Sequence, residues 1–248
     1  MRFDSNGGTP PTDGFLGGPW IPAIRRGIEA MVVGQAGGIA AFDFDDTILD
    51  GDISLAVLDL LDAETERDLH AEYEADCAVD VRSGYAKLVE TLIAGRTELE
   101  VRALATQALD TGLSSGRLRF RPAILDLIWA LQRHGWTVWI VTASPAVMVS
   151  VAAQRVGIPA NHVLGMWCRV GPDGRFLAPT QEPVTYRHGK VDALSIATGG
   201  RSPTFAAGDA VTDLEMLQSA RYALVLDRGN PTLRDEAAVR GWWLQGGL

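Results

Sequence analysis

The chain has 248 residues, enough for one sizeable domain or for a core with a smaller inserted domain, and 47% of them are hydrophobic, so a full core can be buried. Its formal net charge is −9 and no basic stripe is present, which argues against nucleic acid as a partner. No apolar run approaches the length of a membrane span, so we expect no membrane partner either. Residues 1–19 are polar and rich in Gly and Pro, without the apolar core of a secretory signal, and predict a mobile tail.

The two cysteines, Cys77 and Cys168, lie far apart and match no metal-binding or redox spacing. This pattern is typical of reduced thiols, and we expect a cytoplasmic protein.

The first predicted elements are a helix and a buried strand. Apolar residues recur at helical spacing over 20–33, and glycines end this helix before the small apolar run 39–42. Such a run predicts a buried parallel strand. Three carboxylates, Asp43, Asp45 and Asp46, follow it directly.

These carboxylates stand where open α/β sheets bind their ligands, at the carboxyl end of a strand. Like charges on adjacent backbone repel one another, and a divalent cation would relieve the repulsion. The alternative interpretation is an acidic turn in which Asp46 caps a helix or faces outward.

Residues 51–118 show apolar positions three and four apart and few β-branched residues, which indicates several helices. Helices and strands then alternate. We expect helices over 122–134, 146–156, 188–196 and 233–239, strands over 136–141, 162–170, 204–207 and 223–226, and a hairpin turn over 171–175.

The alternation predicts an α/β fold, with a Rossmann-like parallel sheet flanked by helices. We expect residues 20–50 and 119–248 to form this core. Residues 51–118 would form an inserted helical cap domain.

Four polar motifs fall at or just after successive strands, namely DFDDT (43–47), TAS (142–144), HGK (188–190) and GDAVTD (208–213). A closing stretch with Leu226, Asn230-Pro231, Leu233 and Gly241-Trp242 follows. In this order they resemble the haloacid dehalogenase (HAD) superfamily, and most closely its phosphoserine-phosphatase-like branch. The resemblance covers residues 38–50 and 120–245 well, and the insertion only in its helical character.

The resemblance implies a catalytic role for four residues. Asp43 would be the nucleophile, and Asp45 would protonate the leaving alcohol and later deprotonate the attacking water. Thr142 would donate a hydrogen bond to the phosphoryl group, and Lys190 would neutralise it. Ser144, followed by Pro145, is expected to cap a helix and is a candidate substrate contact beside Thr142.

The resemblance also implies a magnesium site. Asp43, the backbone carbonyl of Asp45, and Asp209 would be its ligands, because sparse oxygen ligation suits Mg²⁺. Asp213 would orient Lys190 or a metal-bound water. A turn with a helix cap is the simpler explanation of the GDAVTD motif.

Recognition of the leaving group is more open. Asp52 is a candidate contact for a substrate ammonium, or else a helix cap, and Arg82 is a candidate contact for a substrate carboxylate. Tyr85, Trp167 and Tyr186 could form an aromatic surface for a quaternary ammonium.

The resemblance carried by these residues implies a Mg²⁺-dependent phosphatase that acts on a small phosphorylated metabolite through an aspartyl-phosphate. An amino-alcohol or amino-acid phosphate is expected rather than a sugar phosphate or a nucleotide. A phosphotransferase to an acceptor alcohol and a non-catalytic binding module are the alternatives.

Overall fold

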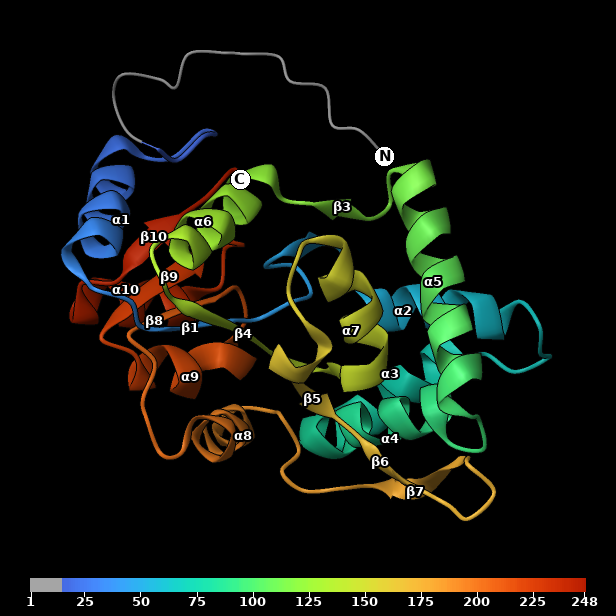
Figure 1. The fold of residues 1–248 in the computed structure, drawn as a ribbon. Coiled ribbons are helices and arrows are strands. Elements are labelled where there is room, and N and C mark those ends of the chain that lie inside the picture. Colours follow the sequence, from blue (N-terminus) through green and yellow to red (C-terminus); the bar gives the residue numbers. More distant parts are fainter. Residues whose placement is uncertain (1–14) are drawn as a thin grey trace, which may run out of the picture.

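A six-stranded parallel sheet forms the centre of the computed structural model, which describes residues 15–248 (Figure 1). The spatial order of its strands is β10-β9-β8-β1-β4-β5. The strands are β1 (Ile39–Phe42), β4 (Thr137–Pro145), β5 (Val163–Met166), β8 (Phe205–Gly208), β9 (Tyr222–Leu226) and β10 (Trp243–Gln245). The predicted Rossmann-like sheet is therefore confirmed.

Helices cover both faces of this sheet, so its inner strands are apolar throughout. On β1, Ala40 and Phe42 face the cluster formed with α1, α6 and α7, whereas Ile39 and Ala41 face α8, α9 and α10. Alternate residues of a strand point to opposite faces, which explains why all four are buried. These helices are α1 (Pro22–Gly34), α6 (Pro122–Arg133), α7 (Ala146–Arg155), α8 (His188–Thr198), α9 (Leu214–Ser219) and α10 (Pro231–Arg240).

The insertion consists of four helices, which lie to one side of the sheet in Figure 1. A side chain caps the first turn of each helix by accepting a backbone hydrogen bond, which explains why the segment divides into separate helices. The helices and their caps are α2 (Ile53–Asp62, Asp52), α3 (Leu69–Val79, Asp68), α4 (Val81–Ile93, Asp80) and α5 (Glu98–Ser115, Thr97).

A two-stranded antiparallel ribbon joins the insertion to the core. β2 (Leu49–Asp50) precedes the insertion and β3 (Arg119–Phe120) follows it. Asp50 forms ion pairs with Arg119 at 2.9 Å and with Arg121 at 2.7 Å across this ribbon. The two ends of the insertion therefore lie side by side.

The single strand predicted over 162–170 is wrong, because the chain forms two strands there. β5 belongs to the main sheet, whereas β6 (Cys168–Val170) pairs with β7 (Phe176–Thr180) in an antiparallel hairpin around the predicted turn. Trp167 lies between the two strands and is 45% exposed.

This hairpin, which lies below α4 in Figure 1, is hydrogen-bonded to the insertion. The backbone N–H of Gly95 donates to the carbonyl of Phe176, and the N–H of Phe176 donates to the carbonyl of Arg96, each at 2.8 Å. The N–H of Thr180 donates to Glu90 Oε1 at 2.9 Å. Phe176 also belongs to a hydrophobic cluster that residues of the insertion share with α7.

The mobile tail predicted for residues 1–19 falls partly on residues 1–14, which lie outside the described residues. Residues 15–19 do not fit that prediction. Leu16 is fully buried in the core, and its backbone N–H donates to Glu29 Oε1 at 2.9 Å.

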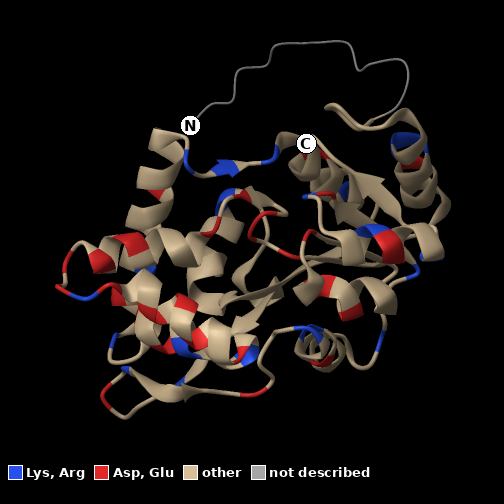
Figure 2. Ribbon diagram, turned by 180° about the vertical axis from the view of Figure 1, so that it is seen from behind, with Lys and Arg blue, Asp and Glu red and all other residues tan. Residues whose placement is uncertain are grey.

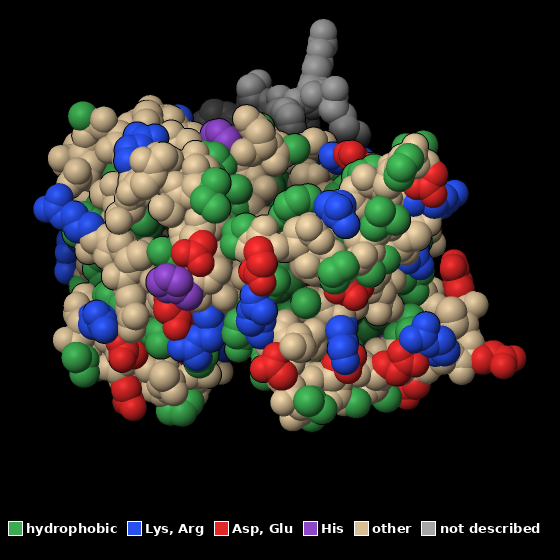
Figure 3. All heavy atoms as spheres, turned by 90° about the horizontal axis from the view of Figure 1, so that it is seen from below, with side chains coloured by type: hydrophobic (Ala, Val, Ile, Leu, Met, Phe, Trp, Pro, Cys, Tyr) green, Lys and Arg blue, Asp and Glu red, His purple; other side chains and the backbone are tan. Residues whose placement is uncertain are grey.

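Within residues 15–248, no helix combines the length and the apolar character needed to cross a membrane. On the face shown in Figure 3, basic and acidic side chains are interspersed rather than gathered into a patch of one sign.

Candidate active site

A small cavity opens at the carboxyl ends of β1, β4 and β8, the edge of the sheet where the sequence motifs were expected to meet. Its volume is about 100 Å³. Its lining comes from both the core and the insertion, and comprises Asp43, Asp45, Asp46, Asp52, Tyr85, Thr142, Ala143, Ser144, Lys190, Asp209, Ala210 and Thr212.

Asp43 is the first residue after β1, and its backbone N–H donates to the carbonyl of Ala207 on β8 at 2.9 Å. Its carboxylate is nearly buried and accepts a hydrogen bond from Lys190 Nζ at 2.6 Å. Burial and the carboxylate of Asp213 raise the pKa of Asp43 well above its ordinary value, while Lys190 lowers it in part. The site therefore holds more negative charge than Lys190 alone neutralises.

Lys190 lies in the first turn of α8 and is only 1% exposed. Its Nζ donates to Asp43 Oδ1 at 2.6 Å and to Asp213 Oδ1 at 2.5 Å. Burial lowers the pKa of Lys190, but Asp213 and Asp43 more than offset this, so its pKa is raised and the ammonium stays charged.

Gly189 explains why HGK carries a glycine. A Cβ at this position would lie 1.8 Å from the carbonyl oxygen of Val184, so any side chain would push α8 and its lysine out of place.

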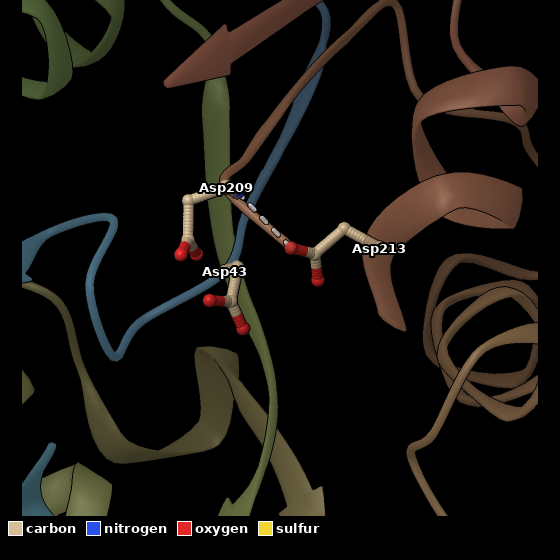
Figure 4. Close-up of side chains that lie close together, drawn as sticks. All are labelled: Asp43, Asp209 and Asp213. Carbon is tan, nitrogen blue, oxygen red and sulfur yellow. Dashed lines mark hydrogen bonds between the residues drawn. The ribbon is translucent and has the colours of Figure 1, made fainter. Parts of the chain in front are cut away.

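Asp213 is fully buried, and its two carboxylate oxygens are both engaged. Oδ1 accepts from Lys190, and Oδ2 accepts from the backbone N–H groups of Asp209 and Ala210, each at 3.1 Å. Figure 4 shows Asp213 reaching toward the loop that carries Asp209. Asp213 therefore fixes both the lysine and the loop that presents Asp209.

Asp209 follows β8, and its Oδ1 accepts from the hydroxyl of Thr47 at 3.0 Å. Burial and the nearby carboxylates of Asp213 and Asp46 raise the pKa of Asp209 to about 6, although Thr47 and Arg228 lower it in part. Oxygen atoms of Asp43, Asp209 and Asp213 all lie within 4.8 Å of one another (Figure 4). This buried group of carboxylates could hold a metal ion.

Asp45 takes part in a hydrogen-bond network with β4 and α2. Its Oδ1 accepts from the backbone N–H of Ile53 at 2.8 Å, and its Oδ2 accepts from the Ser144 hydroxyl at 2.6 Å and the Thr142 hydroxyl at 3.5 Å. Burial and the carboxylate of Asp52 raise the pKa of Asp45 well above its ordinary value, which favours its protonated form.

Ser144 does not cap α7, contrary to the prediction. β4 extends through Pro145, which precedes α7 without a side-chain cap. The Ser144 hydroxyl instead donates to Asp45 and accepts from the Ser54 hydroxyl at 2.8 Å, which links the core to the insertion.

The expectation that Asp46 caps a helix or faces outward is also wrong. Asp46 lines the cavity with a left-handed backbone (φ 58°), and its Oδ1 accepts from the N–H of Gly51 at 3.1 Å. Its other oxygen forms an ion pair with Arg228. Asp46 therefore closes the turn that leads from β1 to the ribbon.

Asp52 is a helix cap that also lies in the lining of the cavity. Asp52 Oδ1 caps α2 by accepting from the N–H of Leu55 at 3.0 Å, and the residue lines the cavity. Tyr85 is the other residue of the insertion in the lining, and its ring packs against that of Tyr186, with centroids 5.7 Å apart.

Arg82 and Trp167 are not brought into the cavity. Arg82 is 49% exposed at its side chain and forms an ion pair with Glu182 at 2.6 Å, because it lies on a solvent-facing position of α4. Trp167 lines a separate apolar groove beside β5 and α8. The predictions that these two residues contact the substrate are not supported by their positions.

Sequence reasoning assigned no role to Thr47 or Arg228. Thr47 is the last residue of the DFDDT motif, and its position there was the available signal. Arg228 lies in the loop after β9, and its guanidinium is 3.4 Å from Asp209 Oδ2. Nothing in the sequence around Arg228 indicates a role in the site.

A family model of the haloacid dehalogenase-like hydrolases matches residues 40–218. The chain therefore belongs to this family of hydrolases, as its four motifs predicted. No curated protein matches the sequence.

Several solved structures share the fold. A protein of unknown function from Anaerococcus prevotii superposes with a TM-score of 0.73 at 16% identity, over 93% of each chain. A phosphoserine phosphohydrolase-like protein from Francisella tularensis has a TM-score of 0.57 at 15% identity, over 84% of this chain and 94% of its own. A substrate-bound phosphoserine phosphatase has a TM-score of 0.57 at 16% identity, over 81% of this chain and 90% of its own. At these identities the likeness is one of fold.

Proposed function

We propose that the protein is a Mg²⁺-dependent phosphatase that hydrolyses a small phosphomonoester through an aspartyl-phosphate on Asp43. The observation that carries the proposal is the arrangement of three groups in one cavity. Asp43 is held against the ammonium of Lys190, and Asp45, with its raised pKa, lines the same cavity. A nucleophile, a counter-charge and an acid are the groups that phosphoryl transfer to a carboxylate requires.

In the first half-reaction, an Asp43 oxygen forms a bond to phosphorus while the bond from phosphorus to the ester oxygen breaks. Asp45 transfers its proton to the departing alkoxide. In the second half-reaction, water attacks the aspartyl-phosphate and gives a proton to the Asp45 carboxylate. The phosphorus bond to Asp43 then breaks, so phosphate leaves and both carboxyl groups return to their starting states.

Lys190 offsets the negative charge of both the Asp43 carboxylate and the incoming phosphoryl group. Its ammonium lies 2.6 Å from Asp43, so it lowers the repulsion between that carboxylate and the incoming phosphoryl group. Asp213 keeps the ammonium in place without lining the cavity itself. Thr142, in the last half of β4, lines the cavity and would donate to a phosphoryl oxygen.

The chemistry of the lining suits a magnesium ion. Five aspartates and a single lysine line the cavity, and burial together with the carboxylates of Asp213 and Asp46 raises the pKa of Asp209. Asp43, Asp209 and the backbone carbonyl of Asp45 would hold the ion, whereas the oxygens of Asp213 already accept hydrogen bonds. When bound, Mg²⁺ supplies the positive charge that activates phosphorus and offsets carboxylate–phosphate repulsion.

Residues 51–118 would act as a cap that selects the leaving group. Every phosphomonoester shares the groups that the core recognises, so selectivity requires residues that reach beyond the phosphate. Asp52 and Tyr85 are the residues of the insertion that line the cavity.

The direct test measures phosphate release from a panel of phosphomonoesters with Mg²⁺ or with a chelator. Release that requires Mg²⁺ supports the proposal, and undiminished release in the chelator contradicts its metal assignment. Adding acceptor alcohols distinguishes hydrolysis from transfer, because a transferase would form new esters at the expense of free phosphate. A protein that releases and transfers no phosphate under any of these conditions would act as a binding module.

Replacing the proposed acid tests the second carboxylate. Asp45→Asn should lower kcat by about 10²–10⁴-fold, because an amide can neither protonate the leaving alkoxide nor deprotonate water. Its amide oxygen can still accept from Ile53, so the variant should fold. Rapid-quench measurement of phosphoenzyme formation and decay should show that both steps are slowed. Wild-type rates in both steps would remove Asp45 from the mechanism.

Replacing a proposed metal ligand tests the magnesium site. Asp209→Ala should weaken Mg²⁺ binding at least about tenfold, since even loss of a hydrogen-bond partner of a ligand typically costs about 10–100-fold. Titration calorimetry measures the binding, and excess Mg²⁺ should restore part of the activity. Asp227→Ala is the matched control, because Asp227 follows β9 and does not line the cavity. Equal Mg²⁺ affinity in the two variants would contradict the assignment.

Ca²⁺ should inhibit phosphate release, because its longer bonds and larger coordination number disturb the geometry of the site.

A further inference from the structure

The two residues that the insertion contributes to the cavity are both of types that can bind cations. Asp52 presents a carboxylate and Tyr85 an aromatic ring, and these are the groups of the lining that come from outside the core. The groups proposed to bind the phosphoryl group all come from the core, so these two residues are the candidates for contact with the rest of the substrate.

Asp52 is suited to a positive group that donates hydrogen bonds. Its Oδ1 accepts from the N–H of Leu55 as the cap of α2, which fixes the orientation of the carboxylate. A carboxylate has about four acceptor positions, so capping leaves capacity for a ligand.

Tyr85 is held by other aromatic rings rather than left free to turn. Its ring packs against Tyr186 with centroids 5.7 Å apart, and edge-to-face against Tyr73 with centroids 6.1 Å apart. A cation within about 6 Å of such a ring is attracted by its π electrons. An aromatic ring and a carboxylate that line one cavity can together bind an ammonium group.

The described lining offers no second basic side chain for another anionic group on the substrate. Among the described residues, Lys190 is the only basic side chain that lines the cavity, and Asp43 and Asp213 both engage it. Arg82, the arginine expected to bind a carboxylate, is paired with Glu182 away from the cavity. A substrate carboxylate would therefore face Asp52 without a counter-charge.

The net negative charge of the insertion also favours a cationic substrate group, and it acts over a longer range. Residues 51–118 hold fourteen of the 31 acidic residues of the chain and six of its 22 Lys and Arg. Figure 2 shows many acidic positions, coloured red, along the helices of the insertion. The resulting potential attracts cationic groups and repels additional anionic ones.

The size of the cavity sets a further limit. At about 100 Å³ it is much smaller than the roughly 300–1,000 Å³ of pockets that hold drug-sized ligands. This size favours a small substrate over a nucleotide or a sugar bisphosphate.

We infer that the substrate is the phosphate monoester of a small amino alcohol, with a cationic nitrogen and no carboxylate. This inference rests on the proposed phosphatase function and selects among its substrates. The amino group would lie between Asp52 and Tyr85, and the phosphate would lie against Asp43 and Lys190.

The experiment compares kcat/KM with Mg²⁺ present for four esters. Phosphoethanolamine and phosphocholine carry the ammonium, O-phosphoserine adds a carboxylate, and p-nitrophenyl phosphate carries no cation. At least one of the two amino-alcohol esters should exceed O-phosphoserine by tenfold or more. The ratio of kcat/KM for phosphoethanolamine to kcat/KM for phosphocholine shows whether Asp52, which accepts hydrogen bonds, or the aromatic ring of Tyr85 contributes more to recognition of the cation.

Three variants locate the selectivity. Asp52→Asn keeps a good helix cap but removes the charge, and should lower kcat/KM for the better amino-alcohol ester about tenfold, with a smaller change for p-nitrophenyl phosphate. Tyr85→Leu should lower kcat/KM for phosphocholine about tenfold, also with a smaller change for p-nitrophenyl phosphate. Asp80→Asn is the matched control, because Asp80 caps α4 through Ser83 and does not line the cavity, and its kcat/KM values should equal those of the wild type.

The outcomes separate the inference from the function on which it rests. Hydrolysis of p-nitrophenyl phosphate with O-phosphoserine preferred over both amino-alcohol esters would overturn the inference and leave the phosphatase intact. Equal losses on all esters in Asp52→Asn would also overturn it, since Asp52 would then act only as a helix cap. Absence of phosphate release from every ester would overturn both.

Discussion

An Asp43→Asn variant is expected to lose at least about 10⁴-fold in kcat and to form no covalent phosphoenzyme. Loss of a nucleophile that works together with an acid and a counter-charge removes nearly all of the chemical acceleration, as measured for hydrolases of other folds. An amide nitrogen and a neutral amide oxygen are both far weaker nucleophiles toward phosphorus than a carboxylate. Acid quench followed by intact mass spectrometry should detect a phosphorylated chain in the wild type and none in the variant.

The fold should survive this substitution, which makes the result interpretable. The amide oxygen of the introduced asparagine can accept the hydrogen bond of Lys190, and Lys190 keeps its second partner, Asp213. The thermal unfolding midpoint should therefore remain close to that of the wild type. Turnover at the wild-type rate, or a phosphoenzyme that still forms in Asp43→Asn, would require a different nucleophile.

Lys190→Met is expected to remove activity and also to lower the free energy of unfolding by about 3–5 kcal/mol. Methionine fills a similar volume, but the substitution leaves the buried carboxylates of Asp43 and Asp213 facing each other without a counter-charge. Breaking a buried ion pair by removing one partner has this cost, whereas the intact pair contributes little net stability. Urea unfolding followed by tryptophan fluorescence measures the change.

The chain supplies its own control, because it contains only one other lysine, Lys87. That lysine forms an exposed ion pair with Asp76 on the surface of the insertion. Lys87→Met should change the free energy of unfolding by no more than about 1 kcal/mol, since water screens exposed pairs, and should leave kcat unchanged. Equal losses of stability in the two variants would show that Lys190 is not the sole counter-charge of the buried carboxylates.

The meeting of Asp43, Asp45, Thr142, Lys190 and Asp209 in one cavity could be predicted from the sequence. Each motif follows or stands near a predicted strand, and parallel strands place their carboxyl ends at one edge of the sheet. Their order along the chain, together with the helical pattern over 51–118, was sufficient to predict the fold. Local sequence patterns determine such helices and strands, so a single sequence is enough to predict them.

The errors concern contacts between segments far apart in the chain. Ser144 before Pro145 has the local pattern of a helix cap, but the buried carboxylate of Asp45, 99 positions away, accepts its hydroxyl instead. Asp46 faces the cavity because Arg228, from the loop after β9, pairs with it. Arg82 was assigned by its charge, whereas the face of α4 on which it lies decides its partner. None of these contacts leaves a periodic signal in the sequence.

The hairpin of β6 and β7 limits how the substrate can enter. The insertion is joined to the sheet at the ribbon of β2 and β3, and main-chain hydrogen bonds at Gly95 and Phe176 join it to the hairpin as well. A body attached at one place can swing in any direction, but a body attached at two separated places can turn only about the line that connects them. A rotation that opens the cavity therefore has a single axis, or it carries the hairpin with it and bends the chain near Trp167 and Gln181.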